Sequence, residues 1–273
     1  MDPAVQQGNI LNRIVEARRE SIAHRKRVLP EVALKLAVEK ARPPRDFWGA
    51  LSRDAYNVIA ELKKASPSRG ILRESYDAGA LAPSLEGAGA AALSVLTEED
   101  FFRGSLADLK EVKKVTQVPV LRKDFIIDPW QVWESRAAGA DSFLLIVAIL
   151  DDETLAELLE LGRSLKMECL VEVHAREELA RAIRAGAHII GVNNRDLRTF
   201  ETSSQTSLEL VNAIPEDCVA VSESGLRTHD DLAQLRRAGF DAFLIGEHLM
   251  KDADPAASLR GLLASNGTNS RLA

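Results

Sequence analysis

Residues 169–194, CLVEVHAREELARAIRAGAHIIGVNN, hold the alternation that decides the fold. Cys169–Val173 is an apolar run of strand length, Ala175–Arg184 is a charged amphipathic segment, and His188–Val192 is a second apolar run. Such short apolar runs are typical of parallel strands that are buried on both faces, and a helix is the usual connection between them. This stretch therefore predicts a strand–helix–strand unit.

The same alternation extends in both directions from residue 57 onward. Further apolar runs of strand length lie at Val58–Leu62, Ala91–Leu96, Val118–Leu121, Asp141–Val147, Cys218–Ser222 and Asp241–Ile245. Amphipathic helical patterns between the runs include Asp152–Leu165 and Thr228–Arg237. Eight β-then-α units in a chain of this length predict a (β/α)8 TIM barrel of the α/β class. A doubly wound open sheet is the main structural alternative.

A glycine recurs after every second expected helix, at Gly89, Gly139, Gly186 and Gly239. Each lies just before an expected strand, where a left-handed C-terminal cap favours glycine. The spacing of about 50 residues corresponds to two βα units, and it favours a barrel of four similar quarters over two unrelated domains.

The first 46 residues do not follow the alternation. Asn9–Arg27 and Val32–Ala41 predict amphipathic helices, and Pro43-Pro44 interrupts the chain after them. We therefore expect an N-terminal helical extension (residues 1–46) packed on a catalytic barrel (47–264), followed by a flexible tail (265–273). The pattern leaves open whether the extension plugs the bottom of the barrel or helps to cover a substrate.

The composition limits the classes of partner. The 273 residues carry 35 Lys+Arg against 41 Asp+Glu, a formal net charge of -6, and 46% are hydrophobic. This balance excludes a disordered chain and suggests neither a nucleic-acid nor a membrane partner. No signal-peptide pattern and no metal-binding spacing of Cys or His occurs, so we expect a cytoplasmic protein without a metal. We expect a monomer, or at most a weak dimer.

Charged residues lie at the carboxyl ends of the expected strands, where barrels carry their chemistry. The two-residue period of a strand points Ile59, Glu61 and Lys63 to the inner face of the first strand. The same reasoning for the third, fifth, sixth and seventh strands gives the full set of candidate catalytic residues: Glu61, Lys63, Lys123, Glu172, Asn193 and Glu223. Burying so many polar groups costs several kcal/mol unless they are paired or bind a ligand.

Glycine-containing loops after the last two strands predict a phosphate site. Ser224-Gly225 follows the seventh strand and Gly246-Glu247 follows the eighth, where many barrels bind phosphate through backbone N–H groups. Ser66–Gly70 after the first strand adds hydroxyl groups and a further glycine.

Several motifs resemble one family. In chain order they are Ile59–Ser68, Ser94–Glu98 with Phe102, Gly104 and Ser105, Leu121–Phe125, Leu170–His174, Gly191–Leu197 and Ser222–Gly225. Together they resemble indole-3-glycerol phosphate synthases of tryptophan biosynthesis, and the likeness extends from about residue 10 to 264. The resemblance implies ring closure of 1-(2-carboxyphenylamino)-1-deoxyribulose 5-phosphate to indole-3-glycerol phosphate, with loss of CO2 and water and without a cofactor.

The resemblance also implies roles for single residues. Lys123 would be the general acid of ring closure, and Lys63 would act in dehydration with Glu61 or Glu172, a choice that the sequence leaves open. Asn193 and Glu223 would position substrate hydroxyls, with Arg195 steadying the acidic groups. The remaining substrate-binding candidates are Ser66, Ser224, Gly225, Gly246 and Glu247 for the phosphate, and Leu96, Phe102, Phe125 and Leu144 for the aryl ring. Some relatives have a hydroxyl residue at position 247, so we expect the Glu247 carboxylate to turn away from the phosphate.

Two kinds of alternative function stay open from the sequence. The first is another phosphate-binding barrel, such as phosphoribosylanthranilate isomerase or an aldolase that forms a Schiff base through Lys123. The second is a barrel that only binds a ligand, which is disfavoured because all six candidate catalytic residues are present.

Overall fold

Eight parallel strands close into a barrel in the computed structural model, which describes residues 3–196 and 201–264, with side chains from residue 10 onward. Around the ring the strands are β1 (Asn57–Leu62), β4 (Ala92–Leu96), β5 (Val120–Lys123), β6 (Ser142–Ile146), β7 (Glu168–Val173), β8 (Ile189–Asn193), β9 (Val219–Glu223) and β10 (Ala242–Ile245), which pairs with β1 again. The predicted TIM barrel is confirmed, and the open sheet is wrong. The predicted tail lies outside the described residues.

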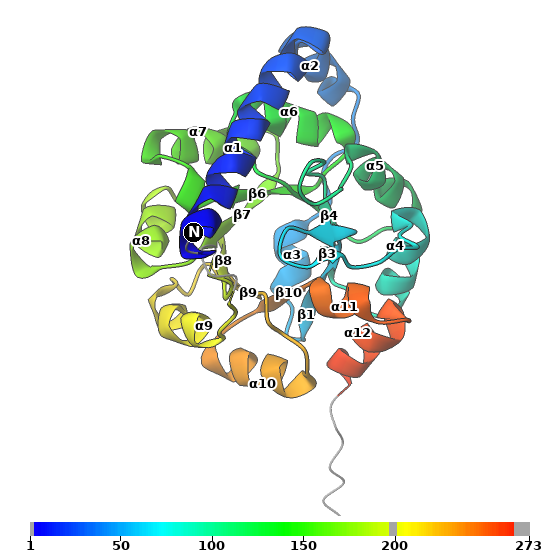
Figure 1. Cartoon of the computed structure of the whole chain (residues 1–273), viewed down its shortest axis with the longest axis vertical. Coiled ribbons are helices and arrows are strands. Elements are labelled where there is room, and N and C mark those ends of the chain that lie inside the picture. Colours follow the sequence, from blue (N-terminus) through cyan, green and yellow to red (C-terminus); the bar gives the residue numbers. More distant parts are fainter. Residues whose placement is uncertain (1–2, 197–200, 265–273) are drawn as a thin grey trace, which may run out of the picture.

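Helices surround the strands (Figure 1). They are α4 (Ala78–Gly87), α5 (Leu106–Val115), α6 (Pro129–Ala138), α7 (Asp152–Ser164), α8 (Arg176–Arg184), α9 (Gln205–Leu210), α10 (His229–Ala238), α11 (Glu247–Lys251) and α12 (Pro255–Leu263), with 3-10 turns η1 (Val147–Ile149) and η2 (Val211–Ala213). The four predicted cap glycines have φ values between 80° and 115°, so the predicted left-handed conformation is confirmed. No helix in the described part of the chain has an apolar stretch that could cross a membrane.

The two faces of each strand enter different cores. Val58, Ala60 and Leu62 pack beneath the helices, whereas Ile59 joins Leu121 inside the barrel. The predicted orientation of the first strand is therefore confirmed, and it directs Glu61 into the barrel mouth, where the side chain is 4% exposed. A short hairpin of β2 (Ala65–Ser66) and β3 (Gly70–Ile71), which the sequence did not predict, follows β1.

The N-terminal segment reaches both ends of the barrel. It forms α1 (Pro3–Val28), α2 (Glu31–Glu39) and α3 (Phe47–Leu51). Figure 1 shows α1, in dark blue, running along one side of the ring towards its centre. Ile14 of α1 packs with Phe125 beyond the carboxyl end of β5, whereas Phe47 of α3 packs in the interior cluster that contains Ala92 at the start of β4. Helix α1 of the extension therefore helps to cover the mouth, whereas α3, which begins at Phe47 after the predicted extension, packs into the barrel interior.

Candidate functional site

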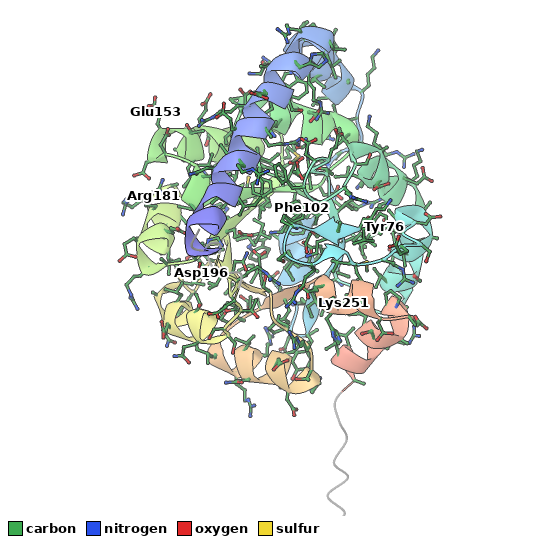
Figure 2. The ribbon with its side chains drawn as sticks, in the orientation of Figure 1. Tyr76, Phe102, Glu153, Arg181, Asp196 and Lys251 are labelled. Carbon is green, nitrogen blue, oxygen red and sulfur yellow. The ribbon has the colours of Figure 1, made fainter. Side chains whose placement is uncertain are left out.

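A cavity of about 490 Å³ opens at the carboxyl ends of the strands. Every residue that the sequence proposed for catalysis or substrate binding lines this cavity. Figure 2 shows side chains crowding the centre of the ring, where Phe102 lies, whereas Glu153 and Arg181 lie on the outer helices. The structure therefore brings the candidates together, and their individual roles stay predictions.

A lysine with a side chain that is 13% exposed bridges two buried carboxylates inside the mouth. The Nζ atom of Lys123, at the end of β5, lies 2.7 Å from Oε2 of Glu172 on β7 and 3.1 Å from Oε2 of Glu223 on β9. The two glutamate side chains are 3% and 1% exposed. In a (β/α)8 barrel, alternate strands contribute side chains to the same interior layer. Lys123 therefore meets Glu172 and Glu223, although they lie 49 and 100 positions further along the chain.

Burial and these ion pairs set the charges of the three groups. Burial by itself would lower the pKa of Lys123, but the charges of Glu172 and Glu223 raise it well above its usual range. Burial would raise the pKa of Glu172, but the charges of Lys123 and His174 bring it well below its usual range. For Glu223, burial and the charge of Glu172 outweigh the opposing effect of Lys123 and raise the pKa to about 7. Lys123 is therefore charged at neutral pH, and Glu223 is the carboxylate that takes up a proton first.

A second ion pair adjoins the first. Lys63 Nζ lies 2.5 Å from Oε2 of Glu61 on β1, and both side chains line the cavity. Glycines make room for the acidic side chains. A Cβ atom at Gly246 would lie 2.0 Å from Glu61 Oε2, and one at Gly191 would lie 2.1 Å from Glu223 Oε1.

The predicted phosphate loops meet on one side of the cavity. Ser224 and Gly225 have φ values of 69° and 81°, and the Asn194 side-chain amide donates to the Ser224 carbonyl oxygen at 3.2 Å, which fixes this left-handed turn. The Ser66 Oγ atom is buried with no hydrogen-bond partner among the described residues, so it is available to a ligand.

The Glu247 carboxylate lies among three basic side chains, and its orientation away from the phosphate stays a prediction. It lies 2.6 Å from Lys251 Nζ, 3.0 Å from Arg195 Nη2 and 3.4 Å from Arg69 Nε. Burial would raise the pKa of Glu247, but the hydrogen bond and charge of Lys251 and the two arginines lower it. Arg69 and Lys251 also line the cavity and were missed by the sequence analysis. Because the basic groups outnumber the single carboxylate, this side of the cavity suits an anion.

The comparisons with known proteins agree with this geometry. The family model described as "Indole-3-glycerol phosphate synthase" matches residues 11–262. The chain belongs to this family. A relative with the same name from Laribacter hongkongensis is 46% identical over 94% of this chain and 99% of its own length. One from Roseiflexus sp. is 48% identical over 93% of this chain and 97% of its own length.

Solved structures support the fold of this indole-3-glycerol phosphate synthase family member. The 3-hexulose-6-phosphate synthase from Salmonella typhimurium superposes with a TM-score of 0.61 at 15% identity, covering 76% of this chain and 96% of that chain. The thiamine phosphate pyrophosphorylase from Pyrococcus furiosus gives a TM-score of 0.58 at 16% identity, over 78% and 95% of the two chains. At such identities the likeness concerns the fold alone.

An apolar wall faces the charged groups of this family member. Leu96, Phe102, Phe125 and Leu144 line the cavity as predicted, and the rings of Phe102 and Phe125 lie 6.0 Å apart between centroids. The Glu98 carboxylate accepts hydrogen bonds from the backbone N–H groups of residues 100, 101 and 102, which fixes the turn that carries Phe102.

Helix α1 completes the apolar wall with Ile10, Leu11 and Ile14, which the sequence analysis missed. The helical pattern of residues 9–27 predicts an apolar face but not the surface that covers it.

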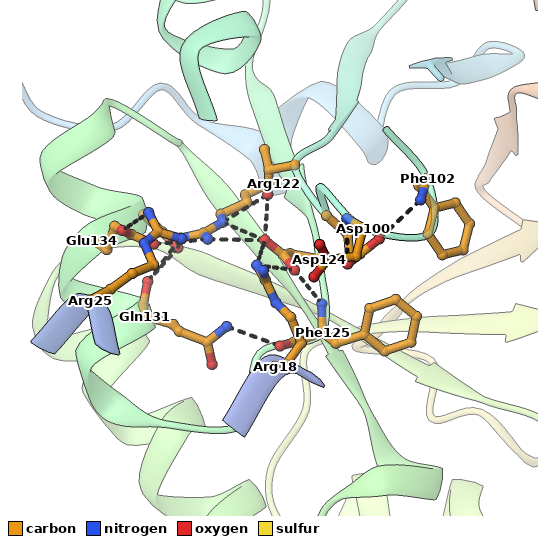
Figure 3. Close-up of polar contacts among 12 residues, drawn as sticks. Arg18, Arg25, Asp100, Phe102, Arg122, Asp124, Phe125, Gln131 and Glu134 are labelled. Carbon is orange, nitrogen blue, oxygen red and sulfur yellow. Dashed lines mark hydrogen bonds and ion pairs between the residues drawn. The ribbon is translucent and has the colours of Figure 1, made fainter. Parts of the chain in front are cut away.

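A buried ion-pair network fixes α1 to the strand end that carries Lys123. Figure 3 shows Arg18 of α1 and Arg122 of β5 converging on Asp124. The Arg18 guanidinium donates to both Asp124 oxygens at 2.6 and 2.7 Å, and Arg122 Nη2 donates to Oδ2 at 2.9 Å. Burial would raise the pKa of Asp124, but the charges of Arg122 and Arg18 lower it. The carboxylate is therefore ionised, and it connects α1 to the residue next to Lys123.

Proposed function

We propose that this cavity closes the indole ring of 1-(2-carboxyphenylamino)-1-deoxyribulose 5-phosphate and releases indole-3-glycerol phosphate, CO2 and water. Membership of the family supports the reaction. The observation that carries the assignment of roles is the charged Lys123, held 2.7 Å from Glu172 between an apolar wall and a basic anion-binding side. An aryl ring fits the first surface and a phosphate fits the second.

Ring closure needs a proton donor at the ribulose carbonyl. We assign this role to Lys123, which donates a proton to the carbonyl oxygen while the aryl carbon bearing the carboxylate attacks the carbonyl carbon. A carbon–carbon bond forms, the carbonyl oxygen becomes a hydroxyl group, and the aryl carboxylate then leaves as neutral CO2. The positive charge of Lys123 also attracts the substrate carboxylate before the reaction.

Dehydration follows at the new hydroxyl group. We assign Lys63 as the acid that protonates this hydroxyl, so that it leaves as water, and Glu61 or Glu172 as the base that removes a proton from the adjacent carbon. The two steps place two protons on oxygen and remove one from carbon, so each turnover takes up one proton from solvent. Asn193 and Glu223 position the hydroxyl groups of the sugar chain.

The phosphate group is assigned to the loops on the basic side. Ser66, Ser224, Gly225 and Gly246 form the cradle, and the Glu247 backbone N–H completes it. The Arg195 side chain, 3.0 Å from the Glu247 carboxylate, offsets the negative charge there.

Two readouts test the assignment of the lysines. Lys123→Ala should abolish the indole fluorescence that appears with the substrate, while circular dichroism shows an intact fold. Lys63→Ala should slow dehydration more than ring closure, so CO2 release precedes indole formation. Near-wild-type rates for either variant would refute its role. Comparing Glu61→Gln with Glu172→Gln in the same assay identifies the base.

A Schiff-base aldolase is disfavoured by the same ion pairs. Schiff-base formation requires a neutral amine, whereas the two carboxylates raise the pKa of Lys123. Borohydride with a ketose substrate should therefore leave the chain unmodified.

We also propose that residues 1–46 form an extension of a barrel spanning residues 47–264, and that the protein acts in the cytoplasm as a monomer or weak dimer. The strand–helix alternation, which begins only after the first 46 residues, supports the domain bounds.

A further inference from the structure

The carboxylate of Glu172 has a second neighbour besides Lys123. Its Oε2 atom accepts from Lys123 at 2.7 Å, whereas its Oε1 atom lies 3.4 Å from Nε2 of His174. This Nε2 atom is buried and has no hydrogen-bond partner among the described residues. His174 is not among the residues that line the cavity. It therefore lies beside Glu172 and outside the cavity lining, with its Nε2 atom buried next to the carboxylate.

The other side of the imidazole ring also faces a carboxylate. Glu178, in the first turn of α8, lies 3.3 Å from His174 Nδ1 and accepts the His174 backbone N–H at 2.7 Å. A neutral imidazole has one N–H group, whereas the imidazolium ion has two. A ring between two carboxylates is therefore best satisfied when both nitrogens carry protons.

The charged groups around His174 agree with this geometry. Burial would lower the pKa of His174, but the hydrogen bond to Glu178 and the charges of Glu172, Glu178 and Glu223 raise it. These carboxylates come from β7, α8 and β9. Lys123 adds a positive charge on the far side of Glu172, where it already neutralises that carboxylate.

We propose that charged His174 is a positioning residue, which donates its Nε2–H to Oε1 of Glu172 and so holds that carboxylate ionised with its other oxygen on Lys123. Glu178 in turn fixes the orientation of the imidazole ring. This inference rests on the proposed roles of Lys123 and Glu172. It adds a row of alternating charges, Glu178–His174–Glu172–Lys123, that leads from α8 to the cavity.

The pH dependence of turnover tests the proposal. The acidic limb of the dependence of kcat on pH reflects the ionisation of the two carboxylates beside Lys123, Glu172 and Glu223, as a coupled pair. Removal of the positive charge of His174 makes both carboxylates harder to ionise. His174→Leu should therefore lower kcat roughly tenfold or more and move this limb to higher pH, while KM changes little. Glu178→Gln should move the limb in the same direction by less.

His174→Gln provides the matched control, because its amide can donate a hydrogen bond without a charge. It should recover part of the kcat that His174→Leu loses, and the limb should stay shifted. In a Glu172→Gln background, His174→Leu should have no further effect on kcat, whereas a purely structural role would lower it again. A ¹⁵N NMR spectrum of the wild type should show protons on both ring nitrogens of His174 at pH 7.

The outcomes separate this inference from the proposed function. Wild-type protein that does not convert the aminodeoxyribulose phosphate contradicts the proposed function. The positioning role alone is contradicted if the wild-type protein is active but His174→Leu leaves the pH profile of kcat unchanged. The same holds if the imidazole of His174 in the active wild type is neutral at pH 7.

Discussion

Gly191 occupies a position where any side chain would displace a proposed catalytic group. The Cβ atom of Gly191→Ala would lie 2.1 Å from Oε1 of Glu223 and 3.1 Å from Cδ1 of Leu170. Non-bonded heavy atoms pack at about 3.5 Å, so the Glu223 carboxylate must move by more than about 1 Å and lose its 3.1 Å contact with Lys123. A displacement of about 1 Å in an active site can cost roughly 100-fold in rate. We therefore expect kcat to fall about 100-fold.

Stability should change much less than activity in this variant. The closest atom, Oε1 of Glu223, is at the end of a flexible side chain and can move. A small shift of Leu170 removes the second close contact. The assay is indole fluorescence under saturating substrate, paired with urea unfolding. Gly261→Ala is the matched control, because a Cβ there meets nothing within 4 Å. In a helix interior this exchange should add about 0.5–1 kcal/mol of stability without changing kcat. Wild-type kcat in Gly191→Ala, or loss of its fold, would refute the reasoning.

Three further predictions follow from the ion pairs. Asp124→Asn should lower the free energy of unfolding by about 3–5 kcal/mol, measured with urea, because it leaves Arg18 and Arg122 buried without their shared carboxylate. Arg195→Met should raise KM for the phosphorylated substrate roughly tenfold and change kcat less, because one cation of the anion side is lost, and an unchanged KM would remove Arg195 from the phosphate site. Glu223→Gln should become more stable relative to wild type as the pH rises from 5 to 8. The raised pKa of Glu223, about 7, means that the folded wild type binds a proton which the unfolded chain releases near its ordinary pKa, so wild-type stability falls across this range. A constant difference between the two proteins would contradict that assignment.

The barrel could be predicted because its signals are local. The apolar runs, the two-residue period and the cap glycines each act over a few residues, and the structure agrees with them. The third strand extends this reasoning beyond its apolar run. That run ends at Leu121, but the sequence predicted that the strand ends at Lys123, and β5 does end there. Both charged residues stay in the strand because buried carboxylates neutralise them. Those partners are mostly distant in the sequence.

The residues of α1 that cover the cavity could not be predicted from the sequence, because their partners are distant in the chain. Arg18 and Asp124 are 106 positions apart, and an amphipathic helix does not specify its partner surface. Arg69 likewise approaches Glu247 from the β2–β3 hairpin, whereas Lys251 lies one turn from Glu247 on the same helix α11. The family resemblance predicted the residues that line the cavity from the strands, because the motifs there are contiguous in the sequence. It did not predict the lining residues on α1.

The interior layers explain why glycines accompany the acidic residues. Glu61, Lys123, Glu172 and Glu223 come from alternate strands of the barrel and so share one layer. An eight-stranded barrel is only wide enough for its interior to be filled by side chains, so four long charged groups in one layer need space above or below them. Gly191 on β8 and Gly246 directly after β10 supply it, because a Cβ atom at either position would overlap a carboxylate. These glycines therefore belong to the site as much as the carboxylates do, and their role is apparent only when the barrel register is known.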